Sequence, residues 1–487
     1  MKKRSTEQKS RTSTNGNREK NREFAVITYL FVGMFILMMG YFVYFQVFRS
    51  EDFINSPYNT RQDTFAEHVI RGEIRSADGK TLAQTVVGED RSESRYYPYG
   101  RMFAHAVGYD SNGKSGIESF GNFSLLRSHA FFLEQVLHGI QNQKNQGDNV
   151  ITTLNYELQE TAYQALGDRR GAVVVLEPAT GKILAMVSKP DFDPNSIAAE
   201  WDSIISNTDS DNSVLVNRTT QGLYPPGSTF KILTTLEYLR EHSDYQNYAY
   251  ECTGSIAMEH TEIHCYDNAV HGAENLEQSF AKSCNTSYAN IGLGLDKKAF
   301  MELCDSMLFG KNLPISYPFN KSSFVLKENS DSDEVTQTAI GQGKTLVTPM
   351  HMALITSAIA NQGVLMRPYV IDHTENYKGV TVKSYRSSQY GSLLTEEEAG
   401  KLQEFMSLVV SEGTGSKLNG QSYQAFGKTG SAEFSNNKSE SHAWFTGYAS
   451  AEEKGTIAVT VIVEKGGAGS TTAVPVAKQV FDRYFGQ

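Results

Sequence analysis

The sequence predicts an α/β fold of the α+β type, in which helices cover an antiparallel sheet. A smaller, mostly β module and an N-terminal transmembrane helix are expected beside it. Three observations lead to this prediction: strand-like runs lie at both ends of the larger part of the chain, helix-like sequence lies between them, and a long apolar segment precedes both. This order is typical of a sheet covered by helices. The length of 487 residues also favours more than one domain.

The first element is a basic tail, residues 1–23, followed by an apolar segment, residues 24–48. The tail holds eight Lys or Arg against three Glu and has no apolar period, so we expect a disordered cytoplasmic segment. The apolar segment carries no charge over its 25 residues, and about 20 such residues cross a bilayer as a helix. It is longer than a signal-peptide core and no small-residue cleavage site follows it, so we expect an uncleaved signal anchor. The positively charged flank of a membrane helix stays in the cytoplasm, which places the chain from about residue 50 onward outside it.

The charge balance argues against one class of partner. The formal net charge is −10 although the tail is basic, so the remaining chain is more acidic still. An acidic surface repels the phosphate backbone, and nucleic acid is therefore not an expected partner.

Two modules are predicted outside the membrane. Residues 49–149 combine short apolar runs with turn signals, which indicates a small, mostly β module. Residues 150–487 form the larger domain. It opens with a hairpin-like pair at 171–177 and 182–188. It closes with strands at 442–449 and 456–464 and a helix at 474–485, whose apolar residues recur on one face.

The chain has four cysteines, Cys252, Cys265, Cys284 and Cys304. Cys252 and Cys265 flank a short segment, so a disulfide between them is one of three full pairings that the sequence leaves open. His260, His264 and His271 lie in the same segment, but their spacing matches no standard zinc motif. We therefore predict no metal site and no cofactor.

Three short motifs carry the candidate chemistry. Ser228 and Lys231 lie three residues apart in a predicted helix that follows two prolines and a glycine. Residues at this spacing share a helix face, so the Lys231 amine can reach the Ser228 hydroxyl and act as the base that an alcohol nucleophile needs. Taken alone, such a pair is more often an N-cap serine and a surface lysine. The other two motifs are Ser283-Cys284-Asn285 and Lys428-Thr429-Gly430-Ser431, and it is the joint occurrence in this order that is specific.

In this order the three motifs resemble those of penicillin-binding proteins and the related serine β-lactamases. Segments 224–231, 340–349 and 442–448 are similar to class B penicillin-binding proteins in particular, and segments 71–74 and 115–118 resemble their non-catalytic pedestal. The resemblance implies a penicillin-binding/serine β-lactamase-like transpeptidase domain at 150–487 on a pedestal at 49–149. Cys284 occupies a position where the usual motif has Asp. That position varies within the family, so we still expect activity.

The resemblance implies a role for each motif residue. Ser228 would be the acylated nucleophile, Lys231 its base and Lys428 a second cation. Ser283 would pass a proton to the leaving D-alanine, and the Asn285 amide would hold the donor peptide backbone.

The third motif would bind the substrate. By resemblance, Thr429 and Lys428 would bind the terminal carboxylate of a D-Ala-D-Ala stem peptide, and the backbone amides of Ser228 and Ser431 would form the oxyanion hole. Gly430 has no side chain, so a substrate backbone can lie close against this strand.

The activity implied is peptidoglycan D,D-transpeptidation, with β-lactams acylating the same serine and a SEDS-family glycosyltransferase as a candidate partner. Alternatives are a D,D-carboxypeptidase, a β-lactamase, and a non-catalytic scaffold or β-lactam sensor. A class A β-lactamase has a Glu with Asn four places on between the second and third motifs, and no Glu from 286 to 427 has one. The sequence leaves elongation, division and sporulation roles open.

Overall fold

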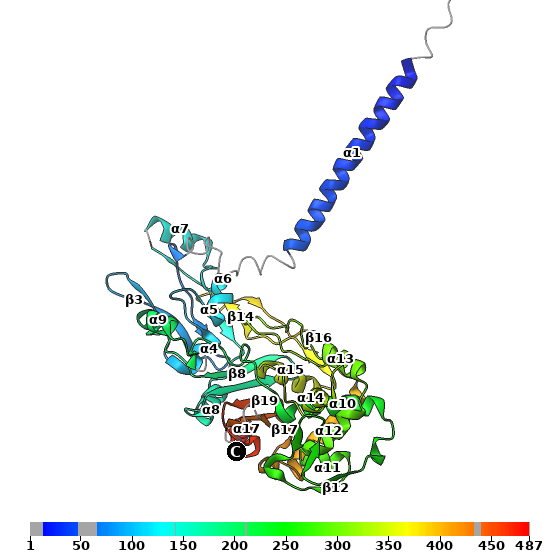
Figure 1. The fold of residues 1–487 in the computed structure, drawn as a ribbon. Coiled ribbons are helices and arrows are strands. Elements are labelled where there is room, and N and C mark those ends of the chain that lie inside the picture. The colour runs from blue at the N-terminus through cyan, green and yellow to red at the C-terminus, as the bar shows by residue number, and fades with distance from the viewer. Residues whose placement is uncertain (1–12, 47–65, 142, 210–211, 433–439, 487) are drawn as a thin grey trace, which may run out of the picture. The chain divides into compact units, whose positions relative to one another are not determined.

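The computed structural model describes residues 13–46, 66–141, 143–209, 212–432 and 440–486, with side chains described from residue 22 onward. Two compact units make up the chain, residues 1–60 and residues 61–487 (Figure 1).

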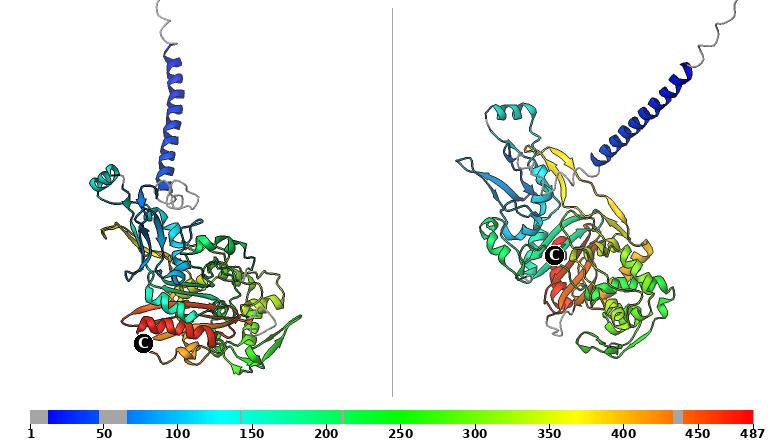
Figure 2. Two further views of the ribbon diagram at one scale, coloured as in Figure 1. Left: turned by 90° about the vertical axis from the view of Figure 1, so that its left-hand side faces the viewer. Right: turned by 45° about the horizontal axis from the view of Figure 1, so that its top comes forward.

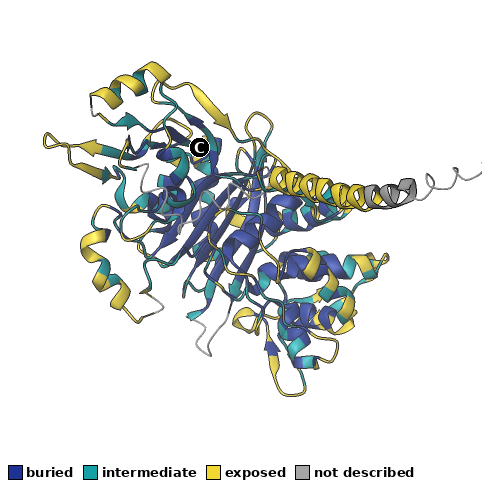
Figure 3. Cartoon of the chain, turned by 90° about the horizontal axis from the view of Figure 1, so that it is seen from above, coloured by how far each residue is buried: buried dark blue, intermediate teal, exposed yellow. Residues whose placement is uncertain are grey.

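The long helix α1 (Ser13–Tyr44) makes up most of the described part of the first unit. Its apolar part, Arg22–Tyr44, has 23 residues and a mean hydropathy of 2.2, and its apolar side chains are exposed (Figure 3). This is the pattern of a single-pass membrane anchor. The helix begins at Ser13, so the prediction of disorder through residue 23 is wrong for 13–23, since extending a formed helix needs no new nucleus. Residues 1–12 of the predicted tail and 47–48 of the predicted anchor lie outside the described residues.

A five-stranded antiparallel sheet forms the centre of the second unit, in the order β17-β18-β19-β7-β8. Both predicted strand pairs are confirmed. The strands are β7 (Gly171–Glu177), β8 (Lys182–Lys189), β17 (Gln424–Ala432), β18 (His442–Ala451) and β19 (Gly455–Val463).

Helices cover this sheet, as predicted, and they lie on both of its faces (Figure 2). Side chains alternate along β7, so Val173 and Val175 pack with α8 (Tyr156–Leu166) and α17 (Gly469–Phe485) on one face. Val174 and Leu176 face the other side, which α15 (Pro349–Ala360) covers. Strands β7 and β19 are buried on both faces over most of their length, which explains their continuous apolar sequence, and the central strands are mostly dark blue in Figure 3. Helix α17 begins five residues before the predicted start at 474.

A mostly helical region lies beside the edge strand β17 (Figure 1). Its helices are α10 (Lys231–Glu241), α11 (Leu276–Ala281), α12 (Asn285–Gly294), α13 (Lys297–Ser306), α14 (Ser332–Ala339) and α16 (Glu396–Ser411). Two small antiparallel pairs, β9 with β12 and β10 with β11, project from it. Their bounds are β9 (Tyr250–Cys252), β10 (Ser255–Ala257), β11 (Glu262–His264) and β12 (Gly272–Glu274).

The smaller module is β-rich, as predicted, around a six-stranded sheet in the order β15-β14-β6-β2-β3-β4. The strands are β2 (Ile74–Arg75), β3 (Thr81–Val87), β4 (Glu93–Tyr96), β6 (Asn149–Thr152), β14 (Ile371–Glu375) and β15 (Thr381–Ser384). It also holds the short helices α4 (Ala104–Val107), α5 (Gly116–Phe120), α6 (Asn122–Leu125) and α7 (Phe132–Ile140). Strands β14 and β15 come from the predicted larger domain, so this sheet joins both modules, and the boundary near residue 150 stays a prediction.

A buried ion pair joins the two segments that suggested a pedestal. Arg71 Nε donates to Glu118 Oε2 at 2.7 Å, and Arg95 Nε donates to Glu118 Oε1 at 2.8 Å. The Glu118 side chain is fully buried. Burial alone raises the pKa of this carboxyl group, but Arg71 and Arg95 together hold the pKa below its ordinary value. The pair therefore stays charged at neutral pH.

Candidate active site

Ser228 lies in a 3-10 turn, Gly227–Phe230, that continues directly into α10. Pro225 and Pro226 restrict the backbone conformation just before this turn. The Pro225 carbonyl oxygen accepts a hydrogen bond from Trp444 Nε1 on β18 at 3.0 Å. The Gly227 N–H donates to the Gly341 carbonyl oxygen at 2.8 Å. The turn is thus fixed from two sides, and the half-buried Ser228 is presented at the beginning of a helix.

Ser283 lies in the short connection between α11 and α12. Its φ is +62°, in the left-handed region that a residue with a side chain rarely adopts. This conformation reverses the chain after α11 and lets Asn285 begin α12. Strain of this kind persists where the surrounding structure requires it, which is common at functional sites.

Two buried lysines meet at Ser283. Lys231 Nζ donates to the Ser283 carbonyl oxygen at 2.7 Å and to Asn285 Oδ1 at 2.8 Å, and lies 3.4 Å from Ser283 Oγ. Lys428 Nζ donates to Ser283 Oγ at 2.8 Å. Among the described residues, no hydrogen bond joins Lys231 to the Ser228 hydroxyl. The Lys231 amine instead points toward Ser283 and Asn285 of the second motif.

Burial changes the protonation of both lysines. Desolvation lowers the pKa of Lys231 to about 8, against an opposing effect of Cys284, Cys265 and Glu274. Desolvation and the nearby Lys231 also lower the pKa of Lys428 well below its ordinary value. With this pKa, roughly a tenth of Lys231 is the neutral amine at pH 7, and that form can accept a proton.

The third motif lies on β17, the edge strand of the central sheet. Thr429, Gly430 and Ser431 line a pocket together with Ser228, Ser283 and Asn285. The predicted site residues of all three motifs therefore converge, with the two lysines beneath Ser283. An edge strand offers free backbone groups to an added peptide strand. A Cβ on Gly430 would lie 3.1 Å from the Pro226 carbonyl oxygen and 3.2 Å from Thr229 Cγ2, so this glycine lets the Ser228 turn lie close against β17.

The structure adds residues that the motifs did not predict. Tyr266, His271, Gln342 and Thr414 also line the pocket, and Thr414 Oγ1 lies 2.5 Å from Thr429 Oγ1. Gln342 falls within the segment 340–349 that already resembled class B proteins. The other three carry no local signal, because only the folded arrangement brings them to the pocket.

Two family descriptions match the chain. "Penicillin binding protein transpeptidase domain" matches residues 171–482, and "Penicillin binding protein A dimerisation domain" matches residues 71–150. The chain belongs to the penicillin-binding protein transpeptidase family. The resemblance read from the three motifs is thereby confirmed, and similar solved structures place the chain in class B of these penicillin-binding proteins.

Among its relatives, the peptidoglycan D,D-transpeptidase PbpA of Mycolicibacterium smegmatis is 30% identical over 475 residues, which cover 91% of this chain and 95% of that protein. The peptidoglycan D,D-transpeptidase MrdA of Acinetobacter baumannii is 28% identical and covers 80% of this chain and 66% of its own. A solved structure of penicillin-binding protein A from Mycobacterium tuberculosis, a ceftriaxone acyl-enzyme complex, superposes with a TM-score of 0.77 at 27% identity, covering 87% of this chain and 99% of that one.

Proposed function

We propose that this penicillin-binding protein is a peptidoglycan D,D-transpeptidase that cross-links stem peptides through an acyl-enzyme on Ser228. The observation that carries the proposal is the meeting of Lys231, Ser283 and Lys428 beneath the pocket that Ser228 lines. Two relatives bear the name of this activity, and the solved relative described above carries a β-lactam as an acyl-enzyme.

In the acylation step, Ser228 Oγ attacks the carbonyl carbon of the penultimate D-alanine. The neutral Lys231 amine takes the hydroxyl proton. The ester bond forms as the amide bond breaks, and Ser283 gives its proton to the leaving D-alanine nitrogen. The Lys231 ammonium, 3.4 Å from Ser283 Oγ, then returns a proton to that oxygen, which restores both groups. Lys428 donates to Ser283 Oγ in the structure, so it stabilises the negative charge that Ser283 acquires.

In the second step, the amine of a neighbouring stem peptide attacks the ester carbon. The new amide bond forms as the bond to Ser228 Oγ breaks, and the proton released by the amine returns to that oxygen. The result is a cross-link and a free enzyme.

The third motif positions the donor peptide. Lys428 and Thr429 bind the terminal carboxylate, and Asn285 holds the peptide backbone against the edge of β17. The backbone N–H groups of Ser228 and Ser431 stabilise the oxyanion, and the loss of one such donor typically costs about 10²–10³ in rate.

We further propose that the basic tail lies in the cytoplasm and that the chain from about residue 50 onward lies outside it, following the positive-inside rule. A SEDS-family glycosyltransferase is the partner implied by the family. Helix α7 supports such a partner surface, since Phe132, Leu137 and Ile140 are between 54% and 77% exposed. Charged substitutions on α7 would then abolish co-purification with a membrane partner without lowering penicillin acylation.

The test of the proposed activity is intact-protein mass spectrometry of the full chain in detergent after incubation with benzylpenicillin, followed by peptide mapping. A persistent adduct on Ser228, absent from Ser228→Ala of equal thermal stability, is the expected result. Purified stem-peptide donor and acceptor should then yield a cross-linked product. A short-lived adduct with drug hydrolysis would indicate a β-lactamase. Release of D-alanine without cross-linking would indicate a carboxypeptidase, and the absence of any adduct would indicate a scaffold.

A further inference from the structure

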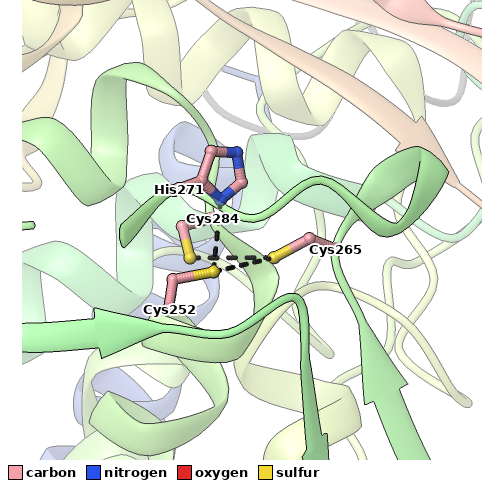
Figure 4. Close-up of side chains that lie close together, drawn as sticks. All are labelled: Cys252, Cys265, His271 and Cys284. Atoms are coloured by element: carbon pink, nitrogen blue, oxygen red, sulfur yellow. Dashed lines mark hydrogen bonds between the residues drawn. The ribbon is translucent and has the colours of Figure 1, made fainter. Parts of the chain in front are cut away.

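Directly beside the second motif lies a set of side chains that the proposed reaction does not use. Their four ligand atoms, three sulfurs and one imidazole nitrogen, all lie within 4.8 Å of one another and point toward a common centre (Figure 4). They come from β9, the loop after β11, the residue before β12 and the residue before α12. We call this set the cysteine-histidine cluster, which consists of Cys252, Cys265, His271 and Cys284.

Three of the six distances within the cluster match tetrahedral zinc coordination. Cys265 Sγ lies 3.7 Å from both Cys252 Sγ and Cys284 Sγ, and Cys252 Sγ lies 3.4 Å from His271 Nδ1. Zinc binds thiolate at about 2.3 Å and imidazole at about 2.0–2.1 Å, so a regular tetrahedron separates two sulfurs by about 3.8 Å and sulfur from nitrogen by about 3.6 Å. The observed separations agree with both values.

A single disulfide does not account for this arrangement. A disulfide between any two of the three cysteines would not explain why the third thiol and the imidazole point to the same centre. All three cysteines are free thiols in the structure. Cys252, Cys265 and Cys284 are at most 1% exposed. Thiols that lose their protons in such a buried place need a cation to offset their charge, and a divalent metal ion supplies it.

The surroundings of the cluster also suit a metal. The buried Thr286 hydroxyl donates to Cys252 Sγ at 3.2 Å and lies 3.4 Å from Cys284 Sγ. A hydroxyl donor to a ligating sulfur stabilises the thiolate and orients it, which is the usual role of residues around a metal site.

We propose that the cysteine-histidine cluster binds a structural Zn²⁺ ion that fixes the second motif of the active site. Cys284 stands between Ser283 and Asn285, and both of these accept hydrogen bonds from Lys231. Asn285 Nδ2 in turn donates to the carbonyl oxygen of His264, the neighbour of Cys265, at 2.9 Å. Four protein ligands close the coordination sphere, so the ion anchors the motif and takes no part in a reaction step. This proposal replaces the sequence-based expectation of no metal.

The ion compensates for the weak local structure of this region. Strands β9 to β12 have three residues each and pair only in twos, and two-stranded pairs are marginally stable by themselves. A metal that joins them to α12 would make the left-handed conformation of Ser283 a fixed feature. The effect on acylation rests on the function proposed above, whereas metal binding does not.

The first test is elemental analysis of the full chain, purified in detergent without chelators. We expect one zinc per chain in the wild type and in Cys304→Ser, which removes a buried free cysteine outside the cluster. Cys265→Ser, which removes a ligand outside all three motifs, should bind less than about a tenth of this amount. Thr286→Val keeps the ligands and should weaken zinc affinity by about 10–100-fold. It serves as the second variant if Cys265→Ser does not fold.

Reconstitution with Co²⁺ gives a readout independent of activity. Tetrahedral thiolate coordination should produce intense visible absorption and sulfur-to-cobalt charge-transfer bands in the wild type and in Ser228→Ala. The proposal would be overturned if the wild-type protein contains no metal and does not bind Co²⁺. A mass loss of two hydrogens, from a disulfide between Cys252 and Cys265, would overturn it as well.

Penicillin acylation separates this proposal from the proposed function. Ser228→Ala should lose acylation and retain zinc, whereas Cys265→Ser should lose zinc and acylate at least about tenfold more slowly. Zinc binding without any acylation in the wild type would refute the transpeptidase assignment alone. Normal acylation in a folded, zinc-free Cys265→Ser would refute the positioning role of the ion.

Discussion

Lys428 Nζ lies 2.8 Å from Ser283 Oγ, although 145 residues separate them in the sequence. Lys231 Nζ, from the first motif, lies 3.4 Å from the same oxygen. Ser283 is therefore the point at which the three motifs meet. A hydroxyl between two buried amines can exchange protons with both, which suits a relay between the attacking oxygen and the leaving nitrogen.

We predict that Ser283→Ala lowers the second-order rate constant of penicillin acylation by about 10²–10⁴-fold, the usual contribution of a positioned proton donor. Ser283→Gly is the matched variant, because it also lacks the hydroxyl but relieves the left-handed conformation at φ +62°. It should acylate as slowly as the alanine variant and be about 1 kcal/mol more stable in thermal denaturation. A normal acylation rate in Ser283→Gly would remove the hydroxyl from the mechanism.

The acylation rate should also depend on pH. Because burial lowers the pKa of Lys231 to about 8, the neutral amine becomes scarcer as pH falls. The charged and titratable groups near it include Lys428, Cys284, Cys265, Glu274 and Tyr288, whose ring centroid lies 5.0 Å from Lys231 Nζ. The rate constant should fall about tenfold for each pH unit below about 8 and level off above it, as measured by stopped-flow with a chromogenic β-lactam.

Lys231→Arg is the control for this profile, because a guanidinium keeps its proton throughout the range and cannot act as a base. This variant should not acylate at any pH. A wild-type rate that stays constant from about pH 6 to about pH 9 would exclude Lys231 as the base.

Periodicity and motif order predicted much of this molecule. The buried strands β7 and β19 read directly as apolar runs, and the motif residues were named from their spacing and order. The beginning of α17 was missed because Gly469-Ser-Thr-Thr has no apolar period. Its position is set by tertiary packing instead, since a Cβ on Gly469 would lie 2.2 Å from the Trp444 carbonyl oxygen.

The cysteine-histidine cluster shows where sequence spacing stops being informative. Standard zinc motifs are recognised because their ligands lie a few residues apart on one turn or knuckle. Here Cys252 and Cys284 lie 32 positions apart and meet only because the β9–β12 segment folds back on α12. The same limit applies to Thr414, whose contact with Thr429 depends on the placement of α16 beside β17.

The glycines of the segment Gly341-Gln342-Gly343 allow a test of how the Ser228 turn is held. Both have positive φ, +76° and +73°, so alanine brings a similar strain of about 1–2 kcal/mol at each. A Cβ on Gly341 would lie 2.0 Å from the Gly227 carbonyl oxygen, whereas on Gly343 it would approach only the flexible Gln337 side chain, at 3.2 Å.

Gly341→Ala should therefore displace the turn and lower the acylation rate constant by at least about tenfold, whereas Gly343→Ala should acylate at nearly the wild-type rate. Acylation kinetics of the two variants at a temperature where both are folded provide the comparison. Equal rates would mean that the contact between Gly341 and Gly227 does not position Ser228.

The Glu118 ion pair should contribute strongly to the stability of the smaller module. Glu118 is fully buried between Arg71 and Arg95, whose side chains are 8% and 5% exposed. Glu118→Gln keeps the shape but leaves two guanidinium groups without their counter-charge, which typically costs about 3–5 kcal/mol. Glu73→Gln is the control, because the Glu73–Arg75 pair is 28% and 36% exposed and should contribute about 0–1 kcal/mol.

Chemical denaturation of the full chain, followed by tyrosine and tryptophan fluorescence, gives the change in the free energy of unfolding for both variants. A loss below about 1 kcal/mol in Glu118→Gln would show that the arginines find other partners when the carboxylate is removed.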